Sequence, residues 1–228
     1  MTDTLSSGMD KSTQYLSDEE IWKLIKFYYP KLNNLDVSRL LPHLDRISAK
    51  DLKIIFREGK RVPYKGRRIQ VSYLETVTRI YKLIGEEGFY RWFSLTSKVS
   101  TINSFCLEGF FKSSIILIEQ GDIFLLEKWT DFGLTLAGRN GRFAISYFTC
   151  TAKVVLSADF EKFKKTIVIG NGFADFDVKV AESYFEHLPD IEPLLSFKNL
   201  DDFGTIIKLI LEIDTESSIE LITNTKDV

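Results

Sequence analysis

The fold is decided by the stretch LEKWTDFGLTLAGRNGRFAISYFTCTAKVV, residues 126–155. In its first part, apolar residues return every three or four positions, which places them on one side of an α-helix. These residues are Leu126, Trp129, Phe132 and Leu136. Gly138 suits the C-terminal cap of such a helix. The second part has the same rhythm, so the stretch predicts two helices joined by a turn at 138–141.

This pattern returns along the chain with a period of 37 residues. Adjacent aromatic residues occur at 110–111, 147–148 and 184–185, and Trp92 and Trp129 form a second series with the same spacing. A helical hairpin of this length cannot bury its apolar side alone, so neighbouring hairpins must stack. We therefore expect an all-α fold, an α-solenoid of about five to six hairpins close to the HEAT class. The alternative is a non-repetitive helical bundle in which the register is accidental.

Turn residues between the apolar segments give the expected helix boundaries. The first helices of the hairpins are expected at 17–29, 50–58, 87–97, 123–137, 160–169 and 199–212. The second helices are expected at 35–44, 69–84, 103–119, 142–157, 176–187 and 215–223. Residues 1–16 are expected to be a disordered N-terminal tail, and residues 17–228 a single helical-repeat domain.

The composition is that of an ordinary globular protein. Of 228 residues, 44% are hydrophobic and 27% are charged, which excludes a collagenous or fully disordered chain. No stretch approaches the roughly 18 uninterrupted apolar residues of a membrane span, and the first sixteen residues lack the apolar core of a secretory signal. Two cysteines form no disulfide framework, so we expect a reducing, cytoplasmic location.

Positive charge is concentrated in one short segment. Residues 57–68 hold six basic side chains and one acidic, whereas residues 69–228 hold sixteen basic and twenty-three acidic. A solvated loop is one interpretation, because Pro63 and Gly66 mark a turn. The other is a docking site for an acidic partner or a phosphate. The candidate partner-binding residues are then Arg57, Lys60, Arg61, Lys65, Arg67 and Arg68.

The residue types that usually carry catalysis are sparse. The two histidines, His43 and His187, have no cysteine at a zinc-site spacing. Cys106 and Cys150 lie in apolar helical segments, where a small buried side chain is expected. There is no phosphate-binding loop and no G-x-S-x-G motif. Asp214 is expected to cap a helix start. We predict no cofactor, no metal and no enzymatic activity.

Several short motifs resemble a known family. They are Trp129-x-x-x-Gly133-x-x-Leu136, Ala144-x-x-Tyr147-Phe148 and Ala181-x-x-Tyr184-Phe185-x-x-x-Pro189. They resemble the helical-repeat region that precedes the von Willebrand factor A domain in nitric oxide reductase activation proteins and their relatives. The resemblance covers residues 87–195 and implies a role beside MoxR-type AAA+ ATPases, which remodel metalloenzymes. The family's metal-site motif has no counterpart here. No functional residue is carried over, because the matched positions are structural.

Three functions remain open from the sequence. The first is a non-enzymatic scaffold or adaptor that binds a protein partner, which the resemblance implies to be an AAA+ ATPase or its client metalloenzyme. The second is a HEAT-like DNA-binding protein or DNA glycosylase, which needs a broad basic groove that the acidic repeat region does not favour. The third is an oligomeric scaffold whose stack continues through its own ends. The sequence leaves open the partner, the pathway, the oligomeric state and whether the chain is a fragment.

Overall fold

The computed structural model describes residues 15–62, 66–137 and 141–225, and these residues form an all-α protein. Within these ranges there are twelve α-helices and no β-strand beyond one bridge between Tyr15 and Ser48. The helices are α1 Asp18–Tyr28, α2 Asn34–Leu44, α3 Ala49–Gly59, α4 Arg67–Ile102, α5 Cys106–Gln120, α6 Ile123–Ala137, α7 Gly141–Cys150, α8 Ala152–Ser157, α9 Phe160–Ala174, α10 Val178–Ile191, α11 Asn199–Leu211 and α12 Thr215–Asn224. A short 3₁₀ turn, η1, covers Glu192–Leu194. Of the expected tail, residues 1–14 lie outside the described residues.

The helix positions follow the sequence expectation, with four differences. The helix expected at 160–169 runs on to Ala174 as α9. The two helices expected at 69–84 and 87–97 are the halves of α4, which breaks at Gly85, where φ is +68°. Only glycine adopts this conformation readily. The helix expected at 142–157 is divided at Thr151 into α7 and α8. The helix expected at 176–187 runs on to residue 191, because Pro189 is accommodated inside α10.

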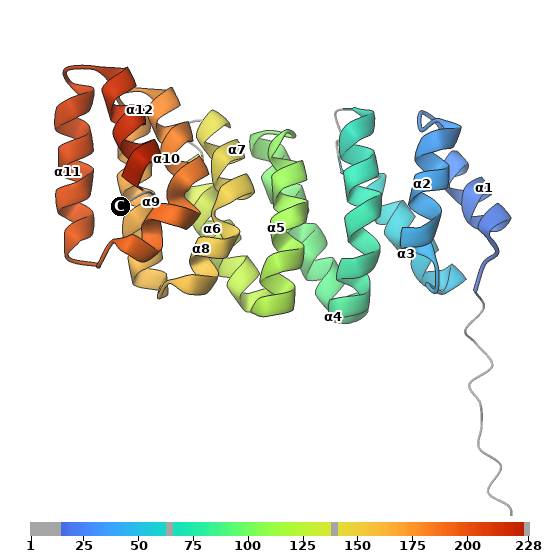
Figure 1. Ribbon diagram of the computed structural model, residues 1–228. Helices are drawn as coiled ribbons and strands as arrows, with labels where there is room; N and C mark the ends of the chain where they lie inside the picture. The colour runs from blue at the N-terminus through green and yellow to red at the C-terminus, as the bar shows by residue number, and fades with distance from the viewer. Residues whose placement is uncertain (1–14, 63–65, 138–140, 226–228) are drawn as a thin grey trace, which may run out of the picture.

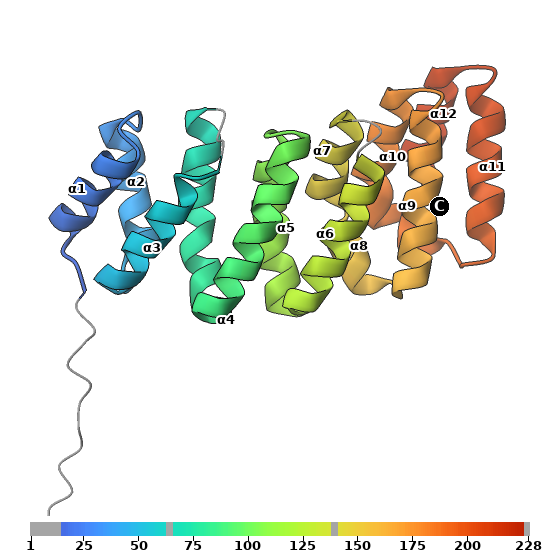
Figure 2. The ribbon, with the colours of Figure 1, turned by 180° about the vertical axis from the view of Figure 1, so that it is seen from behind.

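The helices stand side by side in an elongated array of two rows. One row holds α2, the first half of α4, α5, α7, α10 and α12, and faces the viewer in Figure 1. The other row holds α1, α3, the second half of α4, α6, α9 and α11, and faces the viewer in Figure 2. Helix α1 stands at one end of the array, and α11 and α12 stand at the other. No helix within the described ranges has the length and apolar character needed to cross a membrane.

Side-chain caps begin most helices at regular positions. In the row that begins with α1, the side chains of Ser48, Asp122, Asp159 and Ser196 each accept a hydrogen bond from a backbone N–H three residues further on. In the other row, Asp177 and Asp214 accept from the first turn of their helices, and Asn103 accepts from Phe105, the residue before α5. Such caps satisfy the free N–H groups at a helix start. The expected cap at Asp214 is confirmed.

The core between the rows is a column of stacked aromatic rings. Trp92 and Trp129 are fully buried, as expected, and each is stacked between rings of the opposite row. Ring centroids along the column are 5.4–6.4 Å apart, within the range of favourable aromatic contacts. The column runs Tyr73, Trp92, Phe110, Trp129, Tyr147. It ties at least three hairpins into one continuous core.

Three buried tyrosines bond the two helices of a hairpin together. The hydroxyls of Tyr73, Tyr147 and Tyr184 donate to the backbone carbonyls of residues 55, 129 and 166 at 2.9, 2.7 and 3.2 Å, each 18 positions earlier in the chain. Each ring lies against a glycine, at positions 59, 133 and 170. A methyl group on any of these glycines would come within 2.7 Å of the tyrosine ring. The glycines therefore allow the rings to approach the neighbouring helix.

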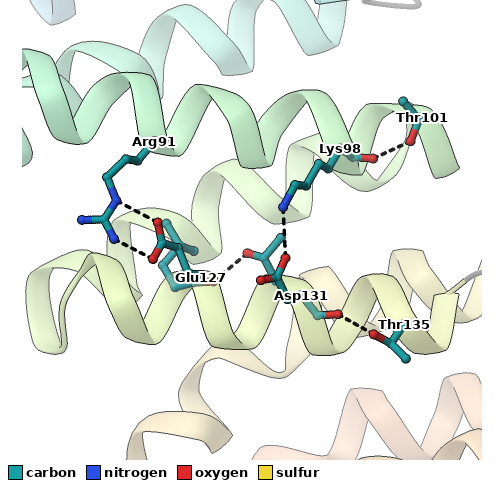
Figure 3. A network of polar contacts seen from close by, with 8 residues as sticks. Arg91, Lys98, Thr101, Glu127, Asp131 and Thr135 are labelled. Atoms are coloured by element: carbon teal, nitrogen blue, oxygen red, sulfur yellow. Dashed lines mark hydrogen bonds and ion pairs between the residues drawn. The ribbon is translucent and has the colours of Figure 1, made fainter.

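Ion pairs connect consecutive helices of the row that begins with α1. Arg91 of α4 donates two hydrogen bonds to Glu127 of α6, at 2.8 and 2.6 Å, and Lys98 reaches Asp131 of the same helix at 3.3 Å (Figure 3). Lys165 of α9 pairs with an α11 aspartate, Asp201, at 2.7 Å. The cation stands on the earlier helix in each of these pairs.

Candidate partner-binding site

Helix α3 presents one apolar side and one basic side. Leu52, Ile55 and Phe56 are fully buried and fix the orientation of the helix against the core. The opposite side carries exposed cations at spacings of three and four residues, which is one helical stripe. They are Lys50, Lys53, Arg57 and Lys60.

Lys50, Lys53 and Arg57 border a groove between α3 and the second half of α4, which we call the α3 groove. Its volume is about 690 Å³. Its lining residues are Tyr28, Ala49, Lys50, Lys53, Ile54, Arg57, Glu86 and Tyr90. Tyr90 is 41% exposed, and Tyr28 and Ile54 are half-buried. The groove therefore offers aromatic and aliphatic surface beside positive charge.

Internal carboxylates neutralise this charge only in part. Arg57 donates to Glu58 at 2.9 Å, and Arg61 reaches the same buried carboxylate at 2.6 Å. Two guanidinium groups therefore share one negative charge. Lys50 lies 3.8 Å from Glu86, a long contact between exposed groups that contributes little.

Two lysines remain available for a ligand. Lys53 has no ion pair or hydrogen bond within the described part of the chain. The ammonium of Lys60 lies 5.8 Å from the ring centres of both Phe27 and Tyr28. Phe27 is 70% exposed, so this cation–π pair is open to solvent, but Lys60 lines a separate pocket with Tyr28 and Lys31.

The remaining residues of the expected basic segment lie elsewhere. Arg67 forms a two-bond ion pair with Asp36 at 2.5 and 2.6 Å, and holds the pKa of that carboxyl below its usual value. Arg68 pairs with Glu108 at 2.7 Å. Both arginines line a different groove, between α2, α4 and α5, of about 540 Å³. Lys65 lies outside the described residues.

The structure thus divides the predicted cluster. Arg57, Lys60 and Arg61 belong to the end of α3, and only Arg57 lines the α3 groove. The basic segment predicted from the sequence does not include Lys50, Lys53 or the aromatic residues of the groove. The spacing of the α3 cations in the sequence is that of one helical stripe. The tyrosines come from other helices, so only the tertiary structure shows that they lie beside these cations.

Reactive groups are held in unreactive surroundings. Burial raises the pKa of the Cys106 thiol to about 12 and that of Cys150 to about 11, which disfavours the nucleophilic thiolate. His187 shares a hydrogen bond of 2.9 Å with the Ser183 carbonyl. Among the described residues, no three His, Cys, Asp or Glu side chains are grouped to hold a metal ion. The chemistry that the α3 groove offers is recognition of negative charge.

Comparison of the chain with protein-family models, with curated proteins and with solved structures found no match.

Proposed function

We propose that the protein is a HEAT-like α-solenoid with a 37-residue period that acts as a non-enzymatic scaffold or adaptor. The capping positions support the period: 122, 159 and 196 follow residue 48 at multiples of 37, and 177 and 214 follow residue 103 in the same way. The tyrosine–carbonyl bonds at 147 and 184 are also 37 residues apart. Stacked hairpins of this kind present extended surfaces that suit protein partners.

The observation that carries the proposal is the α3 groove. It combines an unpaired lysine, Lys53, with two tyrosines, Tyr28 and Tyr90. Outside the groove, the ring of Tyr28 also lies 5.8 Å from the ammonium of Lys60. Exposed cations beside aromatic rings suit an acidic segment that contains apolar residues. The proposed ligand is such a segment of a cytoplasmic partner protein. From the motif resemblance, the first partners to test are a MoxR-type AAA+ ATPase and its client metalloenzyme.

The test uses a labelled acidic peptide with interspersed leucine and aromatic residues, together with a purified MoxR-type ATPase. Binding is measured by fluorescence anisotropy for the unmodified chain, for Lys53→Glu and for Lys128→Glu. Lys128 is a matched control, because it is exposed and unpaired within the described residues and lies on α6 in the same row. Loss of the groove charge should weaken binding about tenfold, and the control should not change it.

Equal binding by both variants would remove the α3 groove from the proposal. Tight binding of duplex DNA, with an affinity that falls steeply with salt, would instead favour the DNA-glycosylase alternative.

A further inference from the structure

The last helix of the row that begins with α1 reverses the charge pattern of its predecessors. Arg91 and Lys165 each reach forward to an acid on the next helix of that row. The position 37 residues after Lys165 holds Asp202, which is exposed on α11. Asp202 therefore favours positive charge on a structure packed against α11, where Arg91 and Lys165 each meet an acid.

The same side of α11 is apolar and uncovered. In α9, Ile169 packs against Gly204 of α11. Its counterpart 37 residues later, Ile206, is 49% exposed, and Leu209 and Ile213 are 56% and 87% exposed. Ile206 and Leu209 are three residues apart on one side of α11, and Ile213 lies in the turn that follows the helix. We call this surface the α11 face; it comprises Asp202, Ile206, Leu209, Glu212 and Ile213.

The surroundings of the α11 face are acidic. Residues 199–225 contain six carboxylates and one lysine, Lys208. Asp201 is already paired with Lys165, but Asp202 and Glu212 have no ion pair in the described structure. An apolar stripe bordered by free carboxylates fits a partner surface that is both cationic and apolar.

The α3 groove of the same chain has these properties. Lys53 is unpaired, and Tyr28 and Tyr90 line the same groove with aromatic surface. The groove and the α11 face lie near opposite ends of the array (Figure 1), so they cannot meet within one molecule. We infer that the α11 face of one copy docks into the α3 groove of a second copy, which gives head-to-tail self-association.

This inference rests on the proposed function, because it names a ligand for the α3 groove: an acidic, apolar helix of the protein itself. Two different surfaces meet, so the contact is heterologous and can add copies until a ring closes. One helix face in one groove is a small interface, typical of transient contacts. Association should therefore grow with protein concentration and decline at high salt.

Sedimentation velocity on the full chain tests the inference, at several protein concentrations and at low and high salt. Lys53→Glu disables the groove, and Leu209→Glu disables the α11 face. Each variant alone should remain monomeric, with association weakened about tenfold or more. An equimolar mixture should form a one-to-one dimer and nothing larger, because each variant keeps one of the two surfaces intact. Val168→Glu, on an exposed helical position of α9, is the control and should associate like the unmodified chain.

A second measurement separates folding effects from docking. The double variant Lys53→Glu, Asp202→Lys exchanges charge on both surfaces and should recover part of the association. A monomeric unmodified chain at every concentration would overturn the inference, as would a mixture that forms no dimer. Peptide binding distinguishes the two proposals. If the unmodified chain stays monomeric while it and Leu209→Glu bind the acidic peptide, the proposed function stands and the inference fails. If no form binds the peptide and none self-associates, both fail.

Discussion

Replacement of Tyr147 by phenylalanine removes one buried hydroxyl and tests what holds a hairpin together. That hydroxyl donates to the Trp129 carbonyl at 2.7 Å, and both residues are fully buried. A buried hydrogen bond of this kind contributes about 1 kcal/mol net, and the carbonyl left behind loses part of its solvation. We expect Tyr147→Phe to lower the free energy of unfolding by about 1–2 kcal/mol.

The structure contains a natural counterpart of this change. Phe110 replaces tyrosine at the position 37 residues before Tyr147, and Thr96 replaces the glycine against which the ring would lie. The Thr96 hydroxyl donates to the Trp92 carbonyl at 3.0 Å. In both hairpins a hydroxyl therefore donates to the tryptophan carbonyl. For Trp92 the donor is Thr96 of the same helix, and for Trp129 it is Tyr147 of the neighbouring helix.

This exchange predicts a coupling between positions 133 and 147. Alone, Gly133→Thr should cost about 1–3 kcal/mol, since its Cβ would lie 2.2 Å from the Tyr147 ring. Combined with Tyr147→Phe, the threonine can donate to the Trp129 carbonyl, as Thr96 does to that of Trp92. The double variant should be more stable than the sum of the single changes by about 1 kcal/mol or more.

Urea denaturation of the four proteins measures this coupling as a double-mutant cycle. If the effects of Gly133→Thr and Tyr147→Phe add to within about 0.5 kcal/mol, the threonine does not replace the tyrosine hydroxyl as donor. A cost below about 0.3 kcal/mol for Tyr147→Phe alone would show that the hydroxyl does not stabilise the hairpin.

Three further changes have expected outcomes. Gly170→Ala should lower the free energy of unfolding, measured by urea denaturation, by about 1–3 kcal/mol, because its methyl group would lie 2.6 Å from two aromatic rings. Gly172→Ala should raise the free energy of unfolding by about 0.5–1 kcal/mol, because its methyl group meets only a flexible lysine at 3.3 Å. The ion pair with Arg67 lowers the pKa of Asp36. The pair therefore stabilises the fold above the pKa of Asp36 in the unfolded chain, and this stabilisation is lost as the pH falls through the pKa in the folded chain. Asp36→Asn should therefore lose less stability than the unmodified chain between about pH 7 and about pH 3. Cys106 and Cys150 should react slowly with a thiol reagent at neutral pH and rapidly after unfolding, since burial raises both pKa values.

Helix positions were predictable because local residues determine them. Ser48 and Asp214 cap their own helices, and Gly85 permits the left-handed backbone conformation that breaks α4. Burial of Trp92 and Trp129 followed from helical periodicity. None of these features depends on a residue far away in the chain.

The candidate site was only partly predictable, because ion pairing depends on tertiary neighbours. Arg67 and Arg68 belong to the same charged segment as Arg57, yet they pair with carboxylates 31 and 40 residues away. The segment therefore contributes less free charge than its sequence indicates. Lys53 lies outside that segment and remains unpaired, which only the packing of α3 shows.

Positions 37 residues apart differ in two ways, one found in the core and the other on the surface. Trp129 donates its indole N–H to Thr151 at 2.9 Å, whereas the indole N–H of Trp92, also fully buried, has no partner among the described residues. Within the core, both positions therefore keep the indole ring, and only one of them keeps its hydrogen bond. On the surface, Asp202 reverses a charge at no cost to packing, because its side chain is exposed. Because the core does not require this change of charge, a binding partner on the surface explains it best. Binding should therefore be sought at the ends of the array.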